Sequence, residues 1–252
     1  MAGDNPQLSR HARHLSLAQV GNDGQRRIEQ GSVLLIGVGG IGCAAANYLA
    51  ASGVGNLLLC DFDTVDVTNL GRQVLYGPGD VDKLKASCAA EHLANINPDI
   101  RITPITERLN GDELAARVSQ VDVVLDCCDN FATRFQVSDA CVAAARCLIS
   151  GAAIRFEGQI AVFGPGYQDS PCYRCLYSDA DESLENCAGN GVLGPVPGVI
   201  GTMMAVETLK YLAGIASPRG ILRLYDAASG ESSSVSIKKR RDCQGCGQDD
   251  TG

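Results

Sequence analysis

The chain has 252 residues, 45% of them hydrophobic, which is enough to bury the core of one large α/β domain or two small ones. Its formal net charge of -8 argues against a nucleic-acid partner, because phosphate backbones are bound by clustered Lys and Arg side chains. It has no apolar run of the ~18–20 residues that cross a bilayer, and its polar start lacks the apolar core of a secretory signal, so we expect a cytoplasmic protein with no membrane partner.

Predicted helices and strands alternate along the chain up to residue 150. Residues 1–30 form a polar arm and a short helix that ends near Gly31. Near-continuous apolar runs then predict strands buried on both faces, at 32–37, 57–61, 100–106, 121–126 and 147–150. Segments of helix-forming composition lie between them, at 43–52, 83–97, 112–118 and 131–146. This alternation favours a parallel sheet that is covered on both faces by right-handed crossovers.

The pattern changes from Gly151 onward. Residues 153–163 predict two short strands around Glu157-Gly158, which indicates an antiparallel extension of the sheet. A Gly- and Pro-rich loop, an apolar helix and two final strands follow, at 185–198, 199–214, 221–226 and 233–237. We therefore predict an α/β fold with a Rossmann-like, doubly wound, mainly parallel sheet that antiparallel strands extend in the C-terminal half.

A glycine-rich turn with the spacing GxGxxG lies between the first predicted strand and the helix after it. Its glycines are Gly37, Gly39 and Gly42, and their missing side chains let a phosphate approach backbone N–H groups at a helix N-terminus. Asp61 ends the next strand about twenty residues on, where a carboxylate can bind ribose hydroxyls. The combination predicts a nucleotide site, and the ordinary user of such a site is a nicotinamide or flavin dehydrogenase.

Four further residues favour phosphate chemistry over hydride transfer. Asn69, Arg72 and Lys85 follow the second strand, and cationic side chains beside a nucleotide match the charge of a polyphosphate. Asp129 follows the strand that ends at residue 126, on the edge where doubly wound sheets bind ligands, and is suited to hold Mg²⁺. Structural interpretations stay open at this point: Asp61 as a helix cap, Lys85 on a solvated face, and Asp129 as the cap of the helix that begins at residue 131.

Two CxxC pairs stand out among the twelve cysteines. Cys172, Cys175, Cys243 and Cys246 have the count and spacing of a tetrahedral zinc site of four thiolates, a zinc knuckle. Such a site leaves no open coordination position, so the ion would be structural and would tie the chain end to the middle. A thioredoxin-like redox pair is the alternative. The cysteines in apolar or strand-like stretches are expected to be buried thiols, namely Cys60, Cys127, Cys128 and Cys141.

Many of these motifs occur together and in order, which chance or a shared fold alone would not give. They are RHARHLSL, GVGGIGCAAANYLAASGVGNLLLCDFDTVDVTNLGRQ, Lys85, INPDI, VVLDCCDN, LISGAAIRFEGQIAVF and CYRC. In these motifs the chain resembles the ThiF/MoeB/HesA family, bacterial relatives of ubiquitin-activating enzymes, over nearly its whole length. One departure is Cys128, which stands where relatives usually have threonine. The two side chains are nearly isosteric, so we expect the site to survive.

The resemblance implies an ATP-dependent adenylyltransferase that activates the C-terminal glycine carboxylate of a ubiquitin-like sulfur-carrier protein ending in Gly-Gly, giving an acyl-adenylate and pyrophosphate. It implies ATP, Mg²⁺ and Zn²⁺ as cofactors, with zinc on the four CxxC cysteines. The implied catalytic residues are Arg13, Asn69, Arg72, Lys85, Asp129 and Cys187. The implied nucleotide-binding residues are Gly37, Gly39, Gly40, Gly42, Asp61, Asp63, Asn69, Leu70, Arg72, Lys85, Cys128 and Asp129, the last of which also holds Mg²⁺.

The resemblance also implies partners. Arg13 matches an arginine that reaches into the partner subunit's ATP pocket, which implies a homodimer. Residues 31–252 would form one adenylation domain, with a nucleotide-binding half at 31–150 and a carrier-binding and zinc half at 151–252. Cys187, in the loop at 185–198, matches a cysteine used in sulfur transfer, although an incidental loop thiol is equally open.

Several alternatives stay open from the sequence. The carrier is either ThiS-type, for thiamine, or MoaD-type, for molybdopterin: residues 185–201 look more like ThiF and residues 150–163 more like MoeB. The absence of a rhodanese domain after Cys246 implies a separate sulfur donor protein. An NAD- or FAD-dependent oxidoreductase that uses the same glycine turn, and a non-catalytic scaffold for a ubiquitin-like partner, are the alternative functions.

Overall fold

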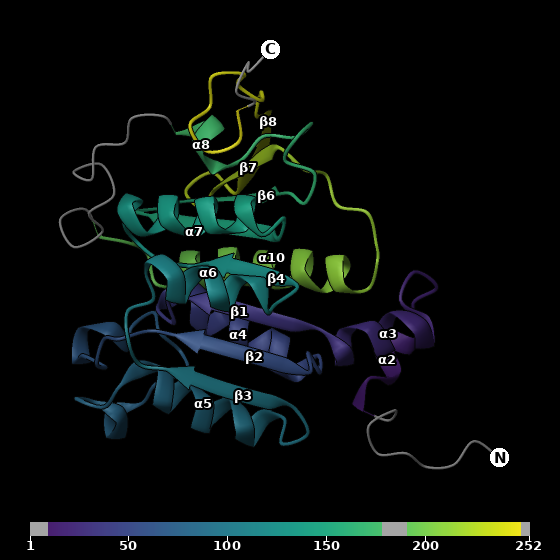
Figure 1. Cartoon of the computed structure of the whole chain (residues 1–252). Helices are drawn as coiled ribbons and strands as arrows, with labels where there is room; N and C mark the ends of the chain where they lie inside the picture. The colour runs from purple at the N-terminus through teal and green to yellow at the C-terminus, as the bar shows by residue number, and fades with distance from the viewer. Residues whose placement is uncertain (1–9, 178–190, 248–252) are drawn as a thin grey trace.

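The computed structural model describes residues 10–177 and 191–247. Its strands form one eight-stranded sheet in the order β3-β2-β1-β4-β5-β6-β7-β8 (Figure 1). In this order the strands pair in parallel from β3 to β5 and antiparallel from β5 to β8. The strands are β1 (Ser32–Ile36), β2 (Asn56–Cys60), β3 (Arg101–Ile105), β4 (Val123–Asp126), β5 (Cys147–Ile154), β6 (Glu157–Phe163), β7 (Ile221–Asp226) and β8 (Glu231–Ser236).

Helices cover both faces of this sheet, as the predicted crossovers require (Figure 1). The helices are α2 (Ala12–Leu15), α3 (Gly21–Gln30), α4 (Gly40–Ala51), α5 (Lys85–Ile96), α6 (Gly111–Ser119), α7 (Phe131–Ala143), α8 (Tyr173–Leu176) and α10 (Pro195–Leu212), with 3-10 turns at Val67–Asn69 and Pro78–Asp80. One apolar cluster lies under α4, α5 and α10, and a second lies under α6 and α7. None of the helices in the described ranges is long and apolar enough to cross a membrane.

The strand order reverses beside β1, because the chain moves outward to β2 and β3 and then returns to β4 on the other side. Ile36 at the end of β1 is in register with Cys60 of β2 and with Asp126 of β4, and Asp126 is in register with Ser150 of β5. The carboxyl ends of β1, β2 and β4 therefore meet at one edge of the sheet, beside Ser150 in the middle of β5. A doubly wound sheet binds its ligands at such a switch point.

The predicted mixed sheet is confirmed, but the turn between β5 and β6 lies earlier than predicted. Strand β5 continues through residue 154, so the prediction of two short strands around Glu157-Gly158 is wrong in its position. The chain turns at Arg155, whose φ is +53°. The Arg155 backbone pairs with residues outside the turn, since its N–H donates to Gly191 O at 2.9 Å and its carbonyl accepts from Leu193 N at 2.8 Å. A contact between segments so far apart in sequence leaves no local turn signal.

Helix α10 begins at Pro195, four residues before the predicted start at 199. Its first turn contains Pro195 and Pro197, which lie within the loop predicted at 185–198. Proline is compatible with the first turn of a helix because the N–H groups there have no intrahelical partner. The short helix α8 and the two 3-10 turns were not predicted.

Candidate active site

The glycine turn after β1 consists of residues with different structural roles. Gly37 has a φ of +90°, a conformation that favours glycine. A Cβ on Gly42 would lie 2.1 Å from the Gly37 carbonyl oxygen, so this glycine lets α4 pack against the turn. A Cβ on Gly39 would have only Gln73 Nε2 near it, at 3.7 Å. Gly39 therefore leaves space beside the first turn of α4, where backbone N–H groups can bind an anion.

A cavity of about 800 Å³ opens at the carboxyl edge of the sheet and continues over β5 to β8. It is lined by ten of the residues predicted from the sequence: Gly37, Gly39, Gly40, Asp61, Asp63, Asn69, Arg72, Lys85, Cys128 and Asp129. Gly42 and Leu70 lie beside it rather than in its wall, because Gly42 packs against the turn and Leu70 packs against the apolar core. The wall also contains residues that the sequence did not single out, among them Phe62, Gln73, Arg108, Arg134, Gln159 and Tyr177.

Asp61 joins the end of β2 to the glycine turn. Its Oδ2 accepts from the backbone N–H of Val38 at 2.8 Å, and its Oδ1 accepts from that of Asp63 at 3.0 Å. Burial raises the pKa of Asp61, and these hydrogen bonds and the charge of Lys85 oppose the rise. Val38 precedes the N-cap of α4, so Asp61 holds the turn rather than capping the helix, and the carboxylate stays at the cavity wall.

Lys85 is the first residue of α5, and its side chain is 8% exposed. Its Nζ lies 3.2 Å from Asp63 Oδ2, so the buried cation has a carboxylate partner at the cavity wall. The solvated-face interpretation of Lys85 is therefore wrong. Arg72 is half-buried, and its Nη1 donates to the carbonyl of Thr68 at 3.1 Å. The turn that carries Thr68 and Asn69 is capped by Asp66, which accepts from Thr68 N at 2.8 Å.

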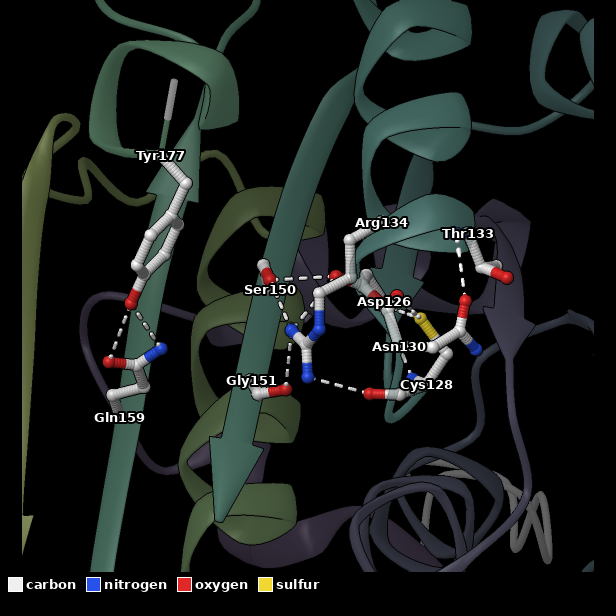
Figure 2. A network of polar contacts seen from close by, with 9 residues as sticks. All are labelled: Asp126, Cys128, Asn130, Thr133, Arg134, Ser150, Gly151, Gln159 and Tyr177. Atoms are coloured by element: carbon white, nitrogen blue, oxygen red, sulfur yellow. Dashed lines mark hydrogen bonds and ion pairs between the residues drawn. The ribbon is translucent and has the colours of Figure 1, made fainter. Parts of the chain in front are cut away.

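Asp129 is exposed at the start of α7. The cap of this helix is Asn130, whose Oδ1 accepts from Thr133 N at 2.9 Å (Figure 2). The alternative in which Asp129 caps the helix is therefore wrong, and its carboxylate is available to the cavity. Below it, Asp126 and Arg134 form a buried ion pair of 3.2 Å.

Arg13 lies outside the cavity of its own chain. It is exposed on α2, which packs against α3. Gly31 at the end of α3 accepts from Asn56 N, so these helices lie at the amino ends of the strands, opposite the cavity (Figure 1). His14 fixes α2 through a hydrogen bond of 3.0 Å between Nδ1 and Gln25 Oε1. Cys187 lies outside the described residues.

The four CxxC cysteines meet beside α8, and all four are buried. Their sulfur atoms lie within 4.8 Å of one another, and the Cys172–Cys243 and Cys175–Cys246 pairs are 3.6 and 3.5 Å apart. Four thiolates around zinc at ~2.3 Å would be about 3.8 Å apart, so the cluster fits a structural zinc ion. A cationic hydrogen-bond donor next to the cluster favours the thiolate form, since Lys239 Nζ lies 3.2 Å from the Cys246 sulfur. A thioredoxin-like redox pair needs only one CxxC motif, so it does not account for the convergence of both.

The other predicted buried thiols are found as expected, with one partial exception. Cys60, Cys127 and Cys141 are buried, whereas Cys128 is half-buried and lines the cavity. Its Sγ donates to Asp126 Oδ1 at 2.8 Å, as a threonine hydroxyl would. Burial raises the pKa of the Cys128 thiol, so it stays protonated and can donate this bond.

Comparison with known proteins places this chain in a family. The model of the ThiF family matches residues 11–246. The chain is 43% identical over 238 residues to the sulfur carrier protein ThiS adenylyltransferase of Escherichia coli K12, covering 94% of both chains. It is 45% identical over 244 residues to the molybdopterin-synthase adenylyltransferase of the same strain, covering 96% of this chain and 97% of the relative.

A likeness to solved structures supports the fold alone. A crystal structure of E. coli MccB with ATP is 22% identical and superposes with a TM-score of 0.81, covering 98% of this chain and 75% of that chain. The similar curated relatives are named as adenylyltransferases, so the oxidoreductase alternative receives no support from them. On the full-length match and the shared fold, this chain belongs to the ThiF family.

Proposed function

We propose that this protein is an ATP-dependent adenylyltransferase that activates the C-terminal glycine carboxylate of a ubiquitin-like sulfur-carrier protein. The observation that carries the proposal is a single cavity in which the glycine turn, a ribose-type acid, two cations and an exposed acid converge. The chain that forms it is 43–45% identical to two adenylyltransferases over nearly its full length. The products would be the acyl-adenylate of the carrier and pyrophosphate.

The mechanism needs no protein nucleophile. A carboxylate oxygen of the carrier attacks the α-phosphorus of ATP, and the bond from that phosphorus to the bridging oxygen of the β-phosphate breaks, releasing pyrophosphate. The chain contributes orientation and charge. Asp61 would bind the ribose hydroxyls, the turn at Gly39 would accept the phosphates, and Lys85 and Arg72 would match their negative charge as it shifts to the leaving group.

Asp129 would hold Mg²⁺, which neutralises charge on the phosphates when bound. Its exposure at the cavity and its freedom from helix capping support this role. The Asp63–Lys85 pair keeps the ammonium group at the wall before the nucleotide arrives. The zinc proposed for the four cysteines would act on stability, since a site of four thiolates has no open position for a substrate.

The part of the cavity over β5 to β8 supports the assignment of residues 151–252 to carrier binding. Its wall includes Ala152 of β5 and Ser233 of β8, small residues on the same face of the sheet as Gln159. At its side, Gln159 Nε2 donates to the hydroxyl of Tyr177 at 2.9 Å (Figure 2). An extended Gly-Gly tail has no side chains to accommodate, so a path over small residues suits it. The carrier is proposed to be ThiS-type or MoaD-type, and a separate protein would donate the sulfur.

The position of Arg13 supports a homodimer. Arg13 is exposed on α2, which packs on α3 at the amino ends of the strands, and it is proposed to act in the cavity of a second copy, as the matching arginine of the family does. Helices α4 and α10 pack together, and each leaves a large apolar side chain about half exposed: 52% for Tyr48 and 50% for Val206. These side chains add apolar surface for a second copy. Cys187 is proposed to take part in sulfur transfer after adenylation.

Carrier-dependent exchange of labelled pyrophosphate into ATP tests the proposed function. The purified chain should catalyse exchange with a ThiS-type or MoaD-type carrier, and a carrier that lacks its last two glycines is the control. Arg72→Ala should abolish the exchange while leaving the fold intact, because Arg72 is half-buried and its side chain donates to the carbonyl of Thr68 in a surface turn. Binding of NAD or FAD, together with no exchange for any Gly-Gly carrier, would contradict the proposal.

A further inference from the structure

Arg134 is a buried arginine that joins three segments beneath the cavity (Figure 2). Its side chain is 3% exposed and that of Asp126 is 1% exposed. From α7, Arg134 Nη1 lies 3.2 Å from Asp126 Oδ2, from Ser150 Oγ and from the Gly151 carbonyl oxygen. Nη2 donates to the carbonyl of Cys128 at 2.6 Å. One guanidinium thus joins the end of β4 and the middle of β5 to the loop that precedes α7.

The contacts converge on Cys128, the residue immediately before Asp129. Its carbonyl oxygen accepts from Arg134, and its N–H and Sγ donate to Asp126 Oδ1 at 3.2 and 2.8 Å. On the other side of Asp129, Asn130 is fixed as the cap of α7. The exposed Asp129 therefore stands between two residues that are held at defined atoms. Within residues 10–177 and 191–247 its carboxylate has no hydrogen bond or ion pair, so its position follows from the backbone that these two neighbours fix.

A buried ion pair is a weak source of net stability, because removing two charges from water offsets most of their attraction. Such a pair is better explained by the geometry that it fixes. A guanidinium suits this role since its planar set of donors can bind several acceptors in fixed directions, which an ammonium group cannot do. Here the acceptors include the carbonyl next to the acid proposed for Mg²⁺ and the carbonyl of Gly151 in β5.

We infer that Arg134 is a positioning residue: through the Cys128 carbonyl it holds Asp129 where that carboxylate binds the Mg²⁺ of the nucleotide. The inference rests on the proposed function, because it takes Asp129 as the magnesium ligand. Groups that orient a metal ligand typically change metal affinity by about 10–100-fold when they are removed. A residue that only stabilised the fold would change the melting temperature and leave the metal affinity unchanged.

The test measures how strongly Mg²⁺ assists ATP binding. The dissociation constant of ATP is determined by calorimetry with saturating Mg²⁺ and with a chelator, and the ratio of the two values is the coupling factor. Arg134→Lys keeps a positive charge beside Asp126 but has a single donor centre, so it cannot also hold the Cys128 carbonyl. We expect the coupling factor to fall about tenfold or more, with ATP affinity in chelator nearly unchanged. Asp129→Ala gives the reference for complete loss of coupling.

Arg174→Gln is a matched control, because Arg174 of α8 forms an ion pair with the helix that carries Arg134. Arg174 pairs with Asp139 of α7 through two contacts of 2.7 and 2.8 Å, away from the cavity. This variant removes an arginine–aspartate pair and should keep the wild-type coupling factor. If Arg134→Lys does not fold, the neutral pair Asp126→Asn with Arg134→Gln replaces it, with the same expected loss of coupling.

The outcomes separate the inference from the proposed function. A wild-type protein whose ATP binding does not depend on Mg²⁺ would overturn the inference, because Asp129 would then hold no metal on the nucleotide, whereas a failure of the proposed function would appear as a lack of carrier-dependent exchange. Strong coupling in the wild type that persists in Arg134→Lys would overturn the inference alone and leave Arg134 as a structural residue. An equal loss of ATP affinity with and without Mg²⁺ would also overturn it, since the ratio would not change.

Discussion

Gly42 and Gly39 belong to one glycine turn, yet the structure predicts opposite consequences for the same substitution. A Cβ on Gly42 would lie 2.1 Å from the Gly37 carbonyl oxygen and 3.0 Å from its carbonyl carbon. Ordinary contact begins at 3.4 Å, so α4 and the turn would have to separate by 1.3 Å, the difference between 3.4 and 2.1 Å. The obstacle is main chain and cannot rotate away.

The magnitude for Gly42→Ala follows from two opposing effects. Replacing glycine by alanine in a helix gains up to about 1 kcal/mol. Overpacking costs about 1–3 kcal/mol, and a rigid backbone obstacle places this site at or above the upper end of that range. We therefore expect a net loss of about 2 kcal/mol, which lowers Tm by about 4–8 °C in a chain of this size.

Gly39→Ala should keep stability to within about 1 kcal/mol, because the backbone at Gly39 is extended, its φ is -82° and a Cβ would have only Gln73 Nε2 near it, at 3.7 Å. The new methyl group would instead occupy the space that we assign to a phosphate. A displaced nucleotide should lower kcat/KM for ATP roughly 100-fold. Thermal melting and carrier-dependent exchange kinetics of the two variants measure both effects. A thermally neutral Gly42→Ala together with a fully active Gly39→Ala would refute this division of roles.

Cys175→Ser should remove zinc and lower Tm, because it takes one of four ligands from a closed site; elemental analysis that finds one zinc per variant chain would contradict the metal assignment. Asp129→Ala should lose carrier-dependent exchange by a factor on the order of 100 or more with Tm unchanged, because Asp129 is exposed and caps no helix. Near wild-type exchange would reject Asp129 as the magnesium ligand. Glu207 tests acid stability: burial acts to raise its pKa, but the ion pairs with Lys210 and Arg223 contribute to a net lowering. Since the folded-state pKa lies below the unfolded value, its stabilisation is present above pH 4.5 and is lost as the pH falls through the folded-state pKa. Glu207→Gln should therefore flatten the acid side of a Tm-against-pH curve, and an unchanged acid side would contradict this.

Much of the fold was predictable because its signals are local. Apolar runs gave β1, β2 and β4 within one or two residues, since strands buried on both faces read as continuous hydrophobic stretches. The glycine spacing and the acid at Asp61 also marked the switch point, because both signals lie within a short stretch of sequence. The turn at Arg155 was misplaced because its conformation depends on pairing with residues 191 and 193, which the local sequence does not encode.

The residues that line the site were predictable from the sequence, but the residues that hold them in place were not. Lys85 alone reads as a surface lysine, and its burial depends on Asp63, which lies 22 residues earlier. Arg134 of α7 gave no signal, because its acceptors Ser150 and Gly151 lie on β5, 16 and 17 residues further along the chain. Residues expected to contact a ligand lie within sequence motifs. The residues that hold them in place are recognised only once the fold brings distant segments together.

Mass measurement of the carrier tests the central claim most directly. The purified chain is incubated with ATP, Mg²⁺ and a ThiS-type or MoaD-type carrier, and the intact carrier is weighed before and after. Adenylation predicts a carrier that gains one AMP on its C-terminal glycine, and predicts no gain when that glycine is deleted. A carrier of unchanged mass for every Gly-Gly protein tried, with ATP neither bound nor consumed, would contradict the account.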